Sequence, residues 1–232
     1  MHYNTGDRLK LTGISGNYST VITDVPASSK AITFNFIACT HGYGNDYPIV
    51  QIGTQIWMAE NLKTTRYNDE TSIPNVTDPA EWLNLTAPGY CWYNNDAATY
   101  KITYGALYNW YAVNTGKLCP AGWHVPSEPE FYVLDDYLGS EGASGGKIKE
   151  AGTTHWYSPN TGATNETGWT GLPGGQRYDD FRVMGYYGFY WTTLDYSTTH
   201  AGVMILYYNV DYADGDWYKK QNGFSVRCLK NP

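Results

Sequence analysis

The segment Ser127-Glu128-Pro129-Glu130-Phe131-Tyr132-Val133-Leu134-Asp135-Asp136-Tyr137-Leu138-Gly139 carries the clearest structural signal in the chain. Ser127 and Glu130 have the spacing of a capping box, which satisfies the first free N–H groups of a helix. Apolar residues then recur at helical spacing, and Gly139 is typical of a helix end. The segment therefore predicts a helix over residues 128–138.

The sequence before this helix predicts a second helix, and the sequence after it predicts loops and a strand. Residues 105–112, with the sequence GALYNWYA, predict a second, weaker helix. Helix signals are few after Gly152, and the segment Phe224–Cys228 alternates apolar and polar side chains as a final strand does. Two helices before a loop-rich, strand-terminated second half predict an α+β domain with a loop-rich antiparallel sheet.

The first 46 residues have a different texture. Apolar and polar side chains alternate around residues 9–11, 18–22 and 32–36, which predicts three or four short antiparallel strands, and residues 40–46 look like a linker. We therefore divide the chain into a β-rich N-terminal segment, 1–46, and a main domain, 47–232. Because three or four short strands are not stable alone, we expect this segment to pack on the main domain or to complete the sheet of a partner.

Composition limits the class of protein. Aromatic and charged residues each make up 16% of the 232 residues, and the 23 tyrosines favour strands and ordered loops over disorder. The net charge of −7 and the absence of a Lys/Arg cluster argue against a partner that is nucleic acid or an anionic membrane. No apolar run approaches the roughly 20 residues of a membrane span, and the start of the chain does not resemble a signal peptide. Any export signal is expected outside this sequence.

The four cysteines, Cys39, Cys91, Cys119 and Cys228, lack the CxxC spacing and the histidine partners of a zinc site. Their even number is compatible with disulfides in an oxidising compartment. It is equally compatible with four buried thiols.

Several blocks in fixed order resemble a known family. They are Val50–Leu62 (VQIGTQIWMAENL), Cys91–Asn95 (CWYNN), Tyr104–Trp110 (YGALYNW), Leu118–Pro126 (LCPAGWHVP), Leu172–Gly175 (LPGG) and Gly223–Cys228 (GFSVRC). Together they span about residues 47–230 and are similar to the Fibrobacter succinogenes major paralogous domain.

This resemblance implies a C-type-lectin-like fold in an exported or lipid-anchored bacterial protein, located outside the cell or on its surface. It also implies structural roles for Cys119 and Cys228, which we expect to form a disulfide. It implies no settled activity, because enzymes, lectins and the variable proteins of diversity-generating retroelements share this architecture.

Motifs that could carry chemistry are weak. The calcium ligands of classical lectins are missing, since the segment 128–130 belongs to a helix start and residues 93–96 are typical of a polar turn. Residues 142–146 match GxSxG but lack the preceding buried strand of a hydrolase, and His124 is expected in the core with a hydrogen bond. We therefore predict no enzyme, no metal site and no cofactor.

The segment Thr192–Asp216 resembles an antibody paratope in composition. It is rich in Tyr, Asp and Thr, also carries Ser197, His200 and Asn209, and contains no Lys, Arg, Glu, Gln or Trp. In proteins similar to this one, diversification of AAC-type codons cannot yield Lys, Glu, Gln, Met or Trp, and only Met204 breaks this restriction here. The alternative is that a Tyr/Thr-rich stretch simply forms strands. Alternation further predicts that Val203 and Ile205 face the core while their neighbours and residues 207–214 face solvent.

We accordingly predict a surface-displayed adhesion or binding module for a protein or glycan ligand. The predicted ligand-binding residues are Tyr187, Tyr190, Asp195, Tyr196, Ser197, Thr198, His200, Tyr207, Tyr208, Asn209, Asp211, Tyr212 and Asp214. The alternative is an assembly subunit of a pilus or envelope complex, in which the N-terminal strands complete a partner sheet.

Overall fold

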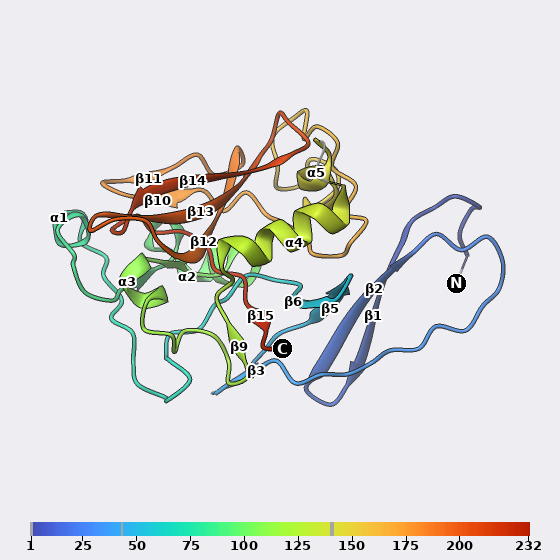
Figure 1. The fold of residues 1–232 in the computed structure, drawn as a ribbon, viewed down its shortest axis with the longest axis horizontal. Coiled ribbons are helices and arrows are strands. Elements are labelled where there is room, and N and C mark those ends of the chain that lie inside the picture. Colours follow the sequence, from blue (N-terminus) through green and yellow to red (C-terminus); the bar gives the residue numbers. More distant parts are fainter. Residues whose placement is uncertain (1, 43, 140–141) are drawn as a thin grey trace.

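The computed structural model describes residues 2–42, 44–139 and 142–232 and has two main sheets (Figure 1). The six-stranded sheet has the order β1 (Leu9–Ser15), β2 (Tyr18–Asp24), β5 (Ile49–Ile52), β6 (Gln55–Met58), β15 (Leu229–Lys230) and β9 (Trp123–His124). The three-stranded sheet has the order β12 (Tyr187–Asp195), β13 (His200–Tyr207) and β14 (Ala213–Lys219). Three short ladders join β3 (Thr40–His41) to β4 (Asn45–Asp46), β7 (Tyr90–Cys91) to β8 (Leu107–Tyr108), and β10 (Gln176–Arg177) to β11 (Phe181–Arg182). The predicted α+β class with mostly antiparallel sheets is confirmed.

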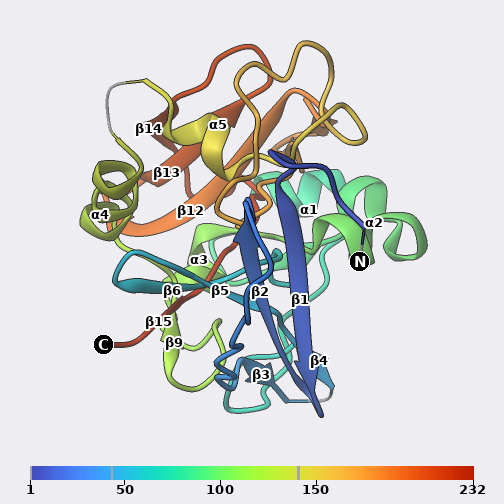
Figure 2. The ribbon, with the colours of Figure 1, turned by 90° about the vertical axis from the view of Figure 1, so that its right-hand side faces the viewer.

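The N-terminal strands join the main sheet. β1 and β2 form an antiparallel hairpin, and β2 runs parallel to β5, with Thr20 opposite Ile49 (Figure 2). The strand predicted around residues 32–36 is wrong, because residues 25–39 form no strand and Phe34 instead packs over Gly13. The predicted linker contains β3 and β4, while Tyr43 within it lies outside the described residues.

The described residues contain five α-helices rather than the two predicted. They are α1 (Pro79–Leu83), α2 (Ala97–Tyr104), α3 (Trp110–Val113), α4 (Glu128–Leu138) and α5 (Ser144–Ile148), with a 3-10 turn η1 (Tyr93–Asn95). α4 confirms the predicted helix, and the Glu130 carboxylate accepts hydrogen bonds from the Ser127 N–H (2.8 Å) and hydroxyl (2.7 Å). The helix predicted over residues 105–112 is wrong.

Gly105 explains that difference. It has a φ of +73°, and a Cβ there would lie 2.6 Å from the Leu62 carbonyl oxygen, so the chain turns sharply at this residue. α2 ends before the turn, β8 follows it, and α3 begins only at Trp110, where the Asn109 side chain accepts from the Ala112 N–H. The local pattern was helical, but the close approach of two backbones divides it.

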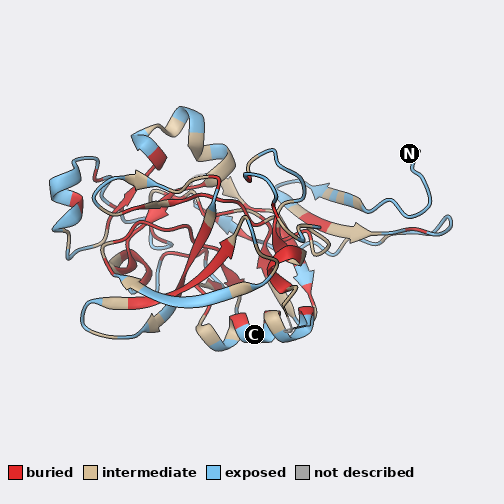
Figure 3. Ribbon diagram, turned by 90° about the horizontal axis from the view of Figure 1, so that it is seen from above, coloured by how far each residue is buried: buried red, intermediate tan, exposed pale blue. Residues whose placement is uncertain are grey.

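Helix α4 lies between the two sheets. Its buried residues Phe131 and Leu134 share one core cluster with Trp57 of β6 and with Tyr190 and Met204 of the three-stranded sheet. A second cluster, around Tyr108, Trp191 and Phe224, occupies the other side of that sheet. Figure 3 shows the resulting distribution, with buried segments concentrated in the body and exposed ones around its outside, including parts of the N-terminal hairpin.

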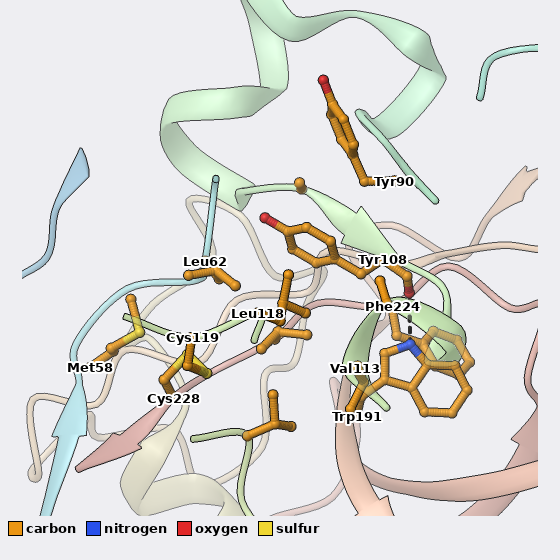
Figure 4. Packing of buried hydrophobic residues seen from close by; sticks show 14 of the residues in the cluster. Met58, Leu62, Tyr90, Tyr108, Val113, Leu118, Cys119, Trp191, Phe224 and Cys228 are labelled. Carbon is orange, nitrogen blue, oxygen red and sulfur yellow. Dashed lines mark hydrogen bonds between the residues drawn. A yellow bond between two sulfur atoms is a disulfide. The ribbon is translucent and has the colours of Figure 1, made fainter. Parts of the chain in front are cut away.

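The closing segment Phe224–Cys228 is buried throughout rather than alternating. Single bridges join Phe224 to Tyr108 of β8 and Ser225 to Tyr190 of β12, and regular pairing begins only at β15. The predicted strand position is therefore wrong. The predicted alternation fails because a segment covered on both sides has no solvent face. Cys228 forms a disulfide with Cys119 in this core, close to Leu118 and Met58 (Figure 4).

The opening and closing family blocks meet around Arg227. Its guanidinium is fully buried, donates to the Asn61 side-chain oxygen at 2.7 Å and to the Met58 carbonyl at 3.2 Å, and lies 4.0 Å from the centre of the Trp169 ring. No carboxylate accepts from it among the hydrogen bonds of the described residues. Carbonyl and amide oxygens with an aromatic face thus balance the desolvation of this charge.

Candidate ligand-binding surface

Apart from Tyr190, the predicted ligand-binding residues lie at two ends of the three-stranded sheet. β13 separates the loop Asp195–His200 from the turn that precedes β14, and a strand of its length spans about 25 Å. We call the first group the loop end (residues 195–200, with the neighbouring part of β14) and the second the turn end (residues 207–214, with Tyr186 and Tyr187). One small ligand cannot contact both.

At the loop end, two aromatic side chains are stacked in solvent. The rings of Tyr196 and Trp217 lie 4.2 Å apart between centroids with an interplanar angle of 13°, and the two residues are 54% and 46% exposed. The Ser197 hydroxyl accepts from the His200 N–H at 3.0 Å, which holds the loop that carries Tyr196. The Asp195 carboxylate pairs with the buried Lys220 ammonium at 2.6 Å. A supported loop therefore presents a flat apolar surface.

A shallow polar hollow of about 270 Å³ adjoins Trp217. Its lining also comprises Gln176, Tyr178, Asp179, Arg182, His200, Tyr218, Lys219 and Asn222. The Lys219 ammonium donates to the Tyr178 hydroxyl at 2.7 Å, and Arg182 pairs with Asp179 at 2.8 Å. Both hydrogen-bond donors and acceptors thus lie next to an aromatic face, which is the combination that recognises a ligand with an apolar face and polar edges.

At the turn end, the tyrosines mainly contact one another. Tyr207 packs edge to face on Tyr187 at 5.4 Å, and Tyr208 packs in the same way on Tyr186 at 5.2 Å. The first pair contacts one core cluster and Tyr208 the other. Burial raises the pKa of the Tyr207 hydroxyl, and the nearby Asp214 carboxylate adds to this effect. Asn209, Tyr212 and Asp214 remain exposed, while Asp211 is half-buried.

A buried lysine holds the turn end from inside. The Lys149 ammonium donates to the carbonyl oxygens of Thr161, Tyr207 and Val210 at 2.9, 2.8 and 2.7 Å. The Lys149 residue is fully buried, and desolvation lowers the pKa of its ammonium to about 8. The turn is thus fixed by three charge-assisted hydrogen bonds rather than left free to adapt to a ligand.

Two predicted placements are wrong. Tyr190 is fully buried, and its hydroxyl accepts from the Leu172 N–H and donates to the Leu172 carbonyl, so it cannot contact a ligand in this structure. Val203 and Ile205 face the core as expected, but their neighbours Met204 and Leu206 are buried as well. The reason is that α4 covers the second face of the sheet.

Sequence reasoning missed Trp217. The paratope-like segment ends at Asp216, one residue earlier, because the composition changes there. The signal that points to Trp217 is its residue type directly after this segment, since Trp is among the residues most enriched in binding hot spots.

The residues weighed for catalysis lie apart from this surface. Ser144 of the GxSxG segment is buried at the start of α5, and its hydroxyl has no hydrogen-bond partner within the described part of the chain; Glu141 beside this segment is not described. His124 is hydrogen-bonded as expected, to Glu130 (2.9 Å) and Asn231 (2.7 Å), but half-exposed rather than buried, because β9 is an edge strand.

The structure also bears on metal and membrane binding. Asp96 accepts from the Thr99 N–H at 3.1 Å and caps α2, so the candidate ion-binding turn serves a helix start. Within residues 2–42, 44–139 and 142–232, no group of three or more His, Cys, Asp or Glu side chains could hold a metal. In the same ranges, no helix is long and apolar enough to cross a membrane.

The fold and the site together define an α+β, disulfide-containing domain with an exposed aromatic surface at the end of an antiparallel sheet. Residues 50–230 match the family of the Fibrobacter succinogenes major domain, and the chain belongs to this family. Neither a curated protein nor a solved structure matches the chain. The family assignment thus agrees with the resemblance seen in the sequence blocks.

Proposed function

We propose that this chain is a ligand-binding or adhesion module, with a C-type-lectin-like fold, that recognises a protein or glycan through its loop end. The observation that carries the proposal is the exposed Tyr196–Trp217 stack beside a polar hollow. Exposed aromatic surface is costly in water, and its retention next to fixed hydrogen-bonding groups favours a recognition role.

Display outside the cytoplasm is part of this proposal. The Cys119–Cys228 disulfide closes a long loop in the core, and such bonds persist mainly in oxidising compartments. The two remaining thiols are buried, and burial raises the pKa of Cys91 to about 12, so neither resembles a reactive cysteine. These features support an extracellular or cell-surface location without an enzymatic role.

The test replaces Tyr196 and Trp217 together by alanine. The variant and the parent chain are compared on a glycan microarray and on a panel of immobilised extracellular-matrix proteins, with EDTA present throughout. We expect at least tenfold weaker capture of every probe that the parent chain binds, since aromatic anchors dominate such interfaces. The EDTA separates this mode of binding from calcium-dependent sugar recognition.

Tyr18→Ala is the matched control, because Tyr18 is an aromatic of similar exposure, 41%, on the distant β1–β2 hairpin. Its capture is expected to equal that of the parent chain. Unchanged capture by the Tyr196/Trp217 variant, with the parent chain binding a probe, would contradict a loop-end site.

A second candidate function is that of an assembly subunit of a pilus or envelope complex. The observation that favours it is the position of β1 at the free edge of the six-stranded sheet, with Ile14 74% exposed near its end. The hairpin already completes the sheet of its own chain through β2, so only the β1 edge is available to a partner. A chain that remains monomeric at high concentration by light scattering, with or without an Ile14→Lys replacement, would argue against assembly through this edge.

Genetic diversification of the segment 192–216 remains a further part of the proposal. The exposed residues at the loop end could vary without loss of the fold, whereas the buried Met204 and Leu206 could not be varied in this way. A reverse transcriptase gene and a template repeat next to the coding sequence would support diversification.

A further inference from the structure

A narrow groove lies between α4 and the edge strand β14, and its lining includes neither Tyr196 nor Trp217. Most of the wall is apolar and comprises Phe131, Leu134, Leu138, Ile148, Met204 and Ala213. The groove therefore offers an aliphatic or aromatic group a surface much like a protein core.

The charged groups of this groove all have the same sign. Among the residues that the structure describes, Glu128, Asp135 and Asp214 contribute to the lining and no Lys, Arg or His does. The Asp214 side chain shares the opposite face of the sheet with Ile205 and accepts from the Tyr207 hydroxyl, so the carboxylates on this side are those of Glu128 and Asp135. Asp135 also lies near the C-terminal end of α4, where the helix dipole disfavours a negative charge. An apolar channel bordered by two carboxylates is complementary to a group that combines an aliphatic stem with a positive charge.

A buried hydroxyl adds a second, independent observation. Ser144 is 2% exposed and lines the same groove, and its Oγ has no hydrogen-bond partner among the residues that the structure describes. A buried polar atom without a partner is costly, and such atoms in native proteins call for an explanation by function or by a bound molecule. The hydroxyl can accept a hydrogen bond from a ligand that enters the groove.

The edge of β14 limits how a partner can bind. The Gly215 N–H donates to the Asp214 carboxylate at 2.9 Å, and the Trp217 N–H donates to the Asp216 carboxylate at 2.7 Å. These aspartates occupy donors that an added strand would need, so pairing of a partner strand with β14 is disfavoured. A partner is thus expected to insert a side chain rather than to extend the sheet.

We propose that the groove between α4 and β14 binds the side chain of a lysine on a partner protein. The methylene groups of the lysine lie along Phe131, Leu134 and Met204, and the ammonium meets the carboxylates of Glu128 and Asp135 on α4. Lysine fits better than arginine, because a slender stem with a compact ammonium can approach carboxylates from separate turns of a helix. A planar guanidinium pairs best with a single carboxylate.

The binding test uses three fluorescein-labelled pentapeptides, Ala-Leu-Xaa-Leu-Ala with acetylated and amidated ends, in which Xaa is lysine, norleucine or glutamate. Fluorescence polarisation is expected to give a Kd of about 1 mM for the lysine peptide and at least tenfold weaker binding for the other two. Equal binding of lysine and norleucine peptides, or no binding of the lysine peptide, would overturn the proposal. Hexylammonium binding as tightly as the lysine peptide would also overturn it, because the occupant would then be a small amine.

Gly215→Leu locates the site. A Cβ at Gly215 would have its nearest neighbour, Glu128 Oε1, at 3.9 Å, so a leucine side chain fits and fills the groove. We expect at least tenfold weaker binding of the lysine peptide, with no change for Gly42→Leu, an exposed glycine with the same nearest-neighbour distance, 3.9 Å, far from the groove. Full binding by Gly215→Leu would place the peptide elsewhere and refute the assignment.

A charge-neutral variant, Glu128→Gln with Asp135→Asn, keeps the shape of the groove and supplies a second readout. Its affinity for the lysine peptide is expected to fall and to lose most of its dependence on salt concentration. An unchanged salt dependence would contradict the role of these carboxylates. Ligand capture at the loop end is expected to stay intact in both variants, so this proposal and the proposed function can fail separately.

Discussion

The loop end and the turn end of the three-stranded sheet have similar compositions but different physical roles. At the loop end, Tyr196 and Trp217 contact each other and leave half of their surface in water. At the turn end, Tyr207 and Tyr208 contact Tyr187 and Tyr186 and close the edges of the two core clusters. A tyrosine-rich segment therefore does not identify a binding surface until its packing is known.

The two ends also differ in how they are held. A buried ammonium fixes the turn end through three carbonyl groups, whereas at the loop end the buried Lys220 ammonium pairs with one largely exposed carboxylate, that of Asp195, beside hydrogen bonds of Ser197. Removal of a donor from three buried carbonyl groups costs more than loss of one pair with an exposed carboxylate, so we expect stability to depend on the turn end and recognition on the loop end.

Lys149→Met is the replacement with the largest expected effect on stability. It leaves three buried carbonyl groups without their donor, and we expect the free energy of unfolding to fall by about 3 kcal/mol in urea denaturation. Lys219→Met is the matched control at the loop end, because the same replacement there affects an exposed side chain and should change stability by less than about 0.5 kcal/mol. Equal effects of the two replacements would contradict a special contribution of the buried Lys149 ammonium.

Replacement of Tyr207, Tyr208 and Tyr212 together by alanine sharpens the comparison. Loss of two edge-to-face pairs, each contributing about 1 kcal/mol, should lower the free energy of unfolding by about 2 kcal/mol, while ligand capture at the loop end is retained. Thermal unfolding and the capture assay measure the two quantities. Lost capture at unchanged stability would instead place the binding surface at the turn end.

The pH dependence of the turn end gives a smaller effect with a definite sign. Lys149 has a folded-state pKa of about 8, below its usual value near 10.4, so between these values the unfolded chain binds a proton that the folded chain has lost. Relative to Lys149→Met, the free energy of unfolding should therefore rise, by about 1 kcal/mol between pH 8 and 9. A fall over this range, or no change in the difference, would contradict a lowered pKa.

Part of the fold was predictable because its signals are local. The helix over residues 128–138 was found because its start and apolar spacing are complete within its own sequence. The helix expected over residues 105–112 failed because Gly105 meets the backbone of Leu62, a contact distant in sequence. Local patterns predict an element only where no distant segment crosses it.

The candidate site was predictable only in composition. The sequence pointed to an aromatic segment near the C-terminus, but it included the buried Tyr190 and missed the exposed Trp217. Alternation assumes that one face of a strand meets water, whereas α4 covers the second face of β12 and β13. Neither strand carries in its own sequence the information that a helix will cover it.

The sequence by itself determined the helix at Ser127–Leu138, the family blocks and the abundance of tyrosine, because each depends on residues near one another in the chain or on composition. Only the tertiary structure decided that the tyrosines divide between two distant ends and that Trp217 completes one of them. The physical reason is that the burial of a side chain depends on which segments pack against both faces of its sheet, and those segments come from distant parts of the chain.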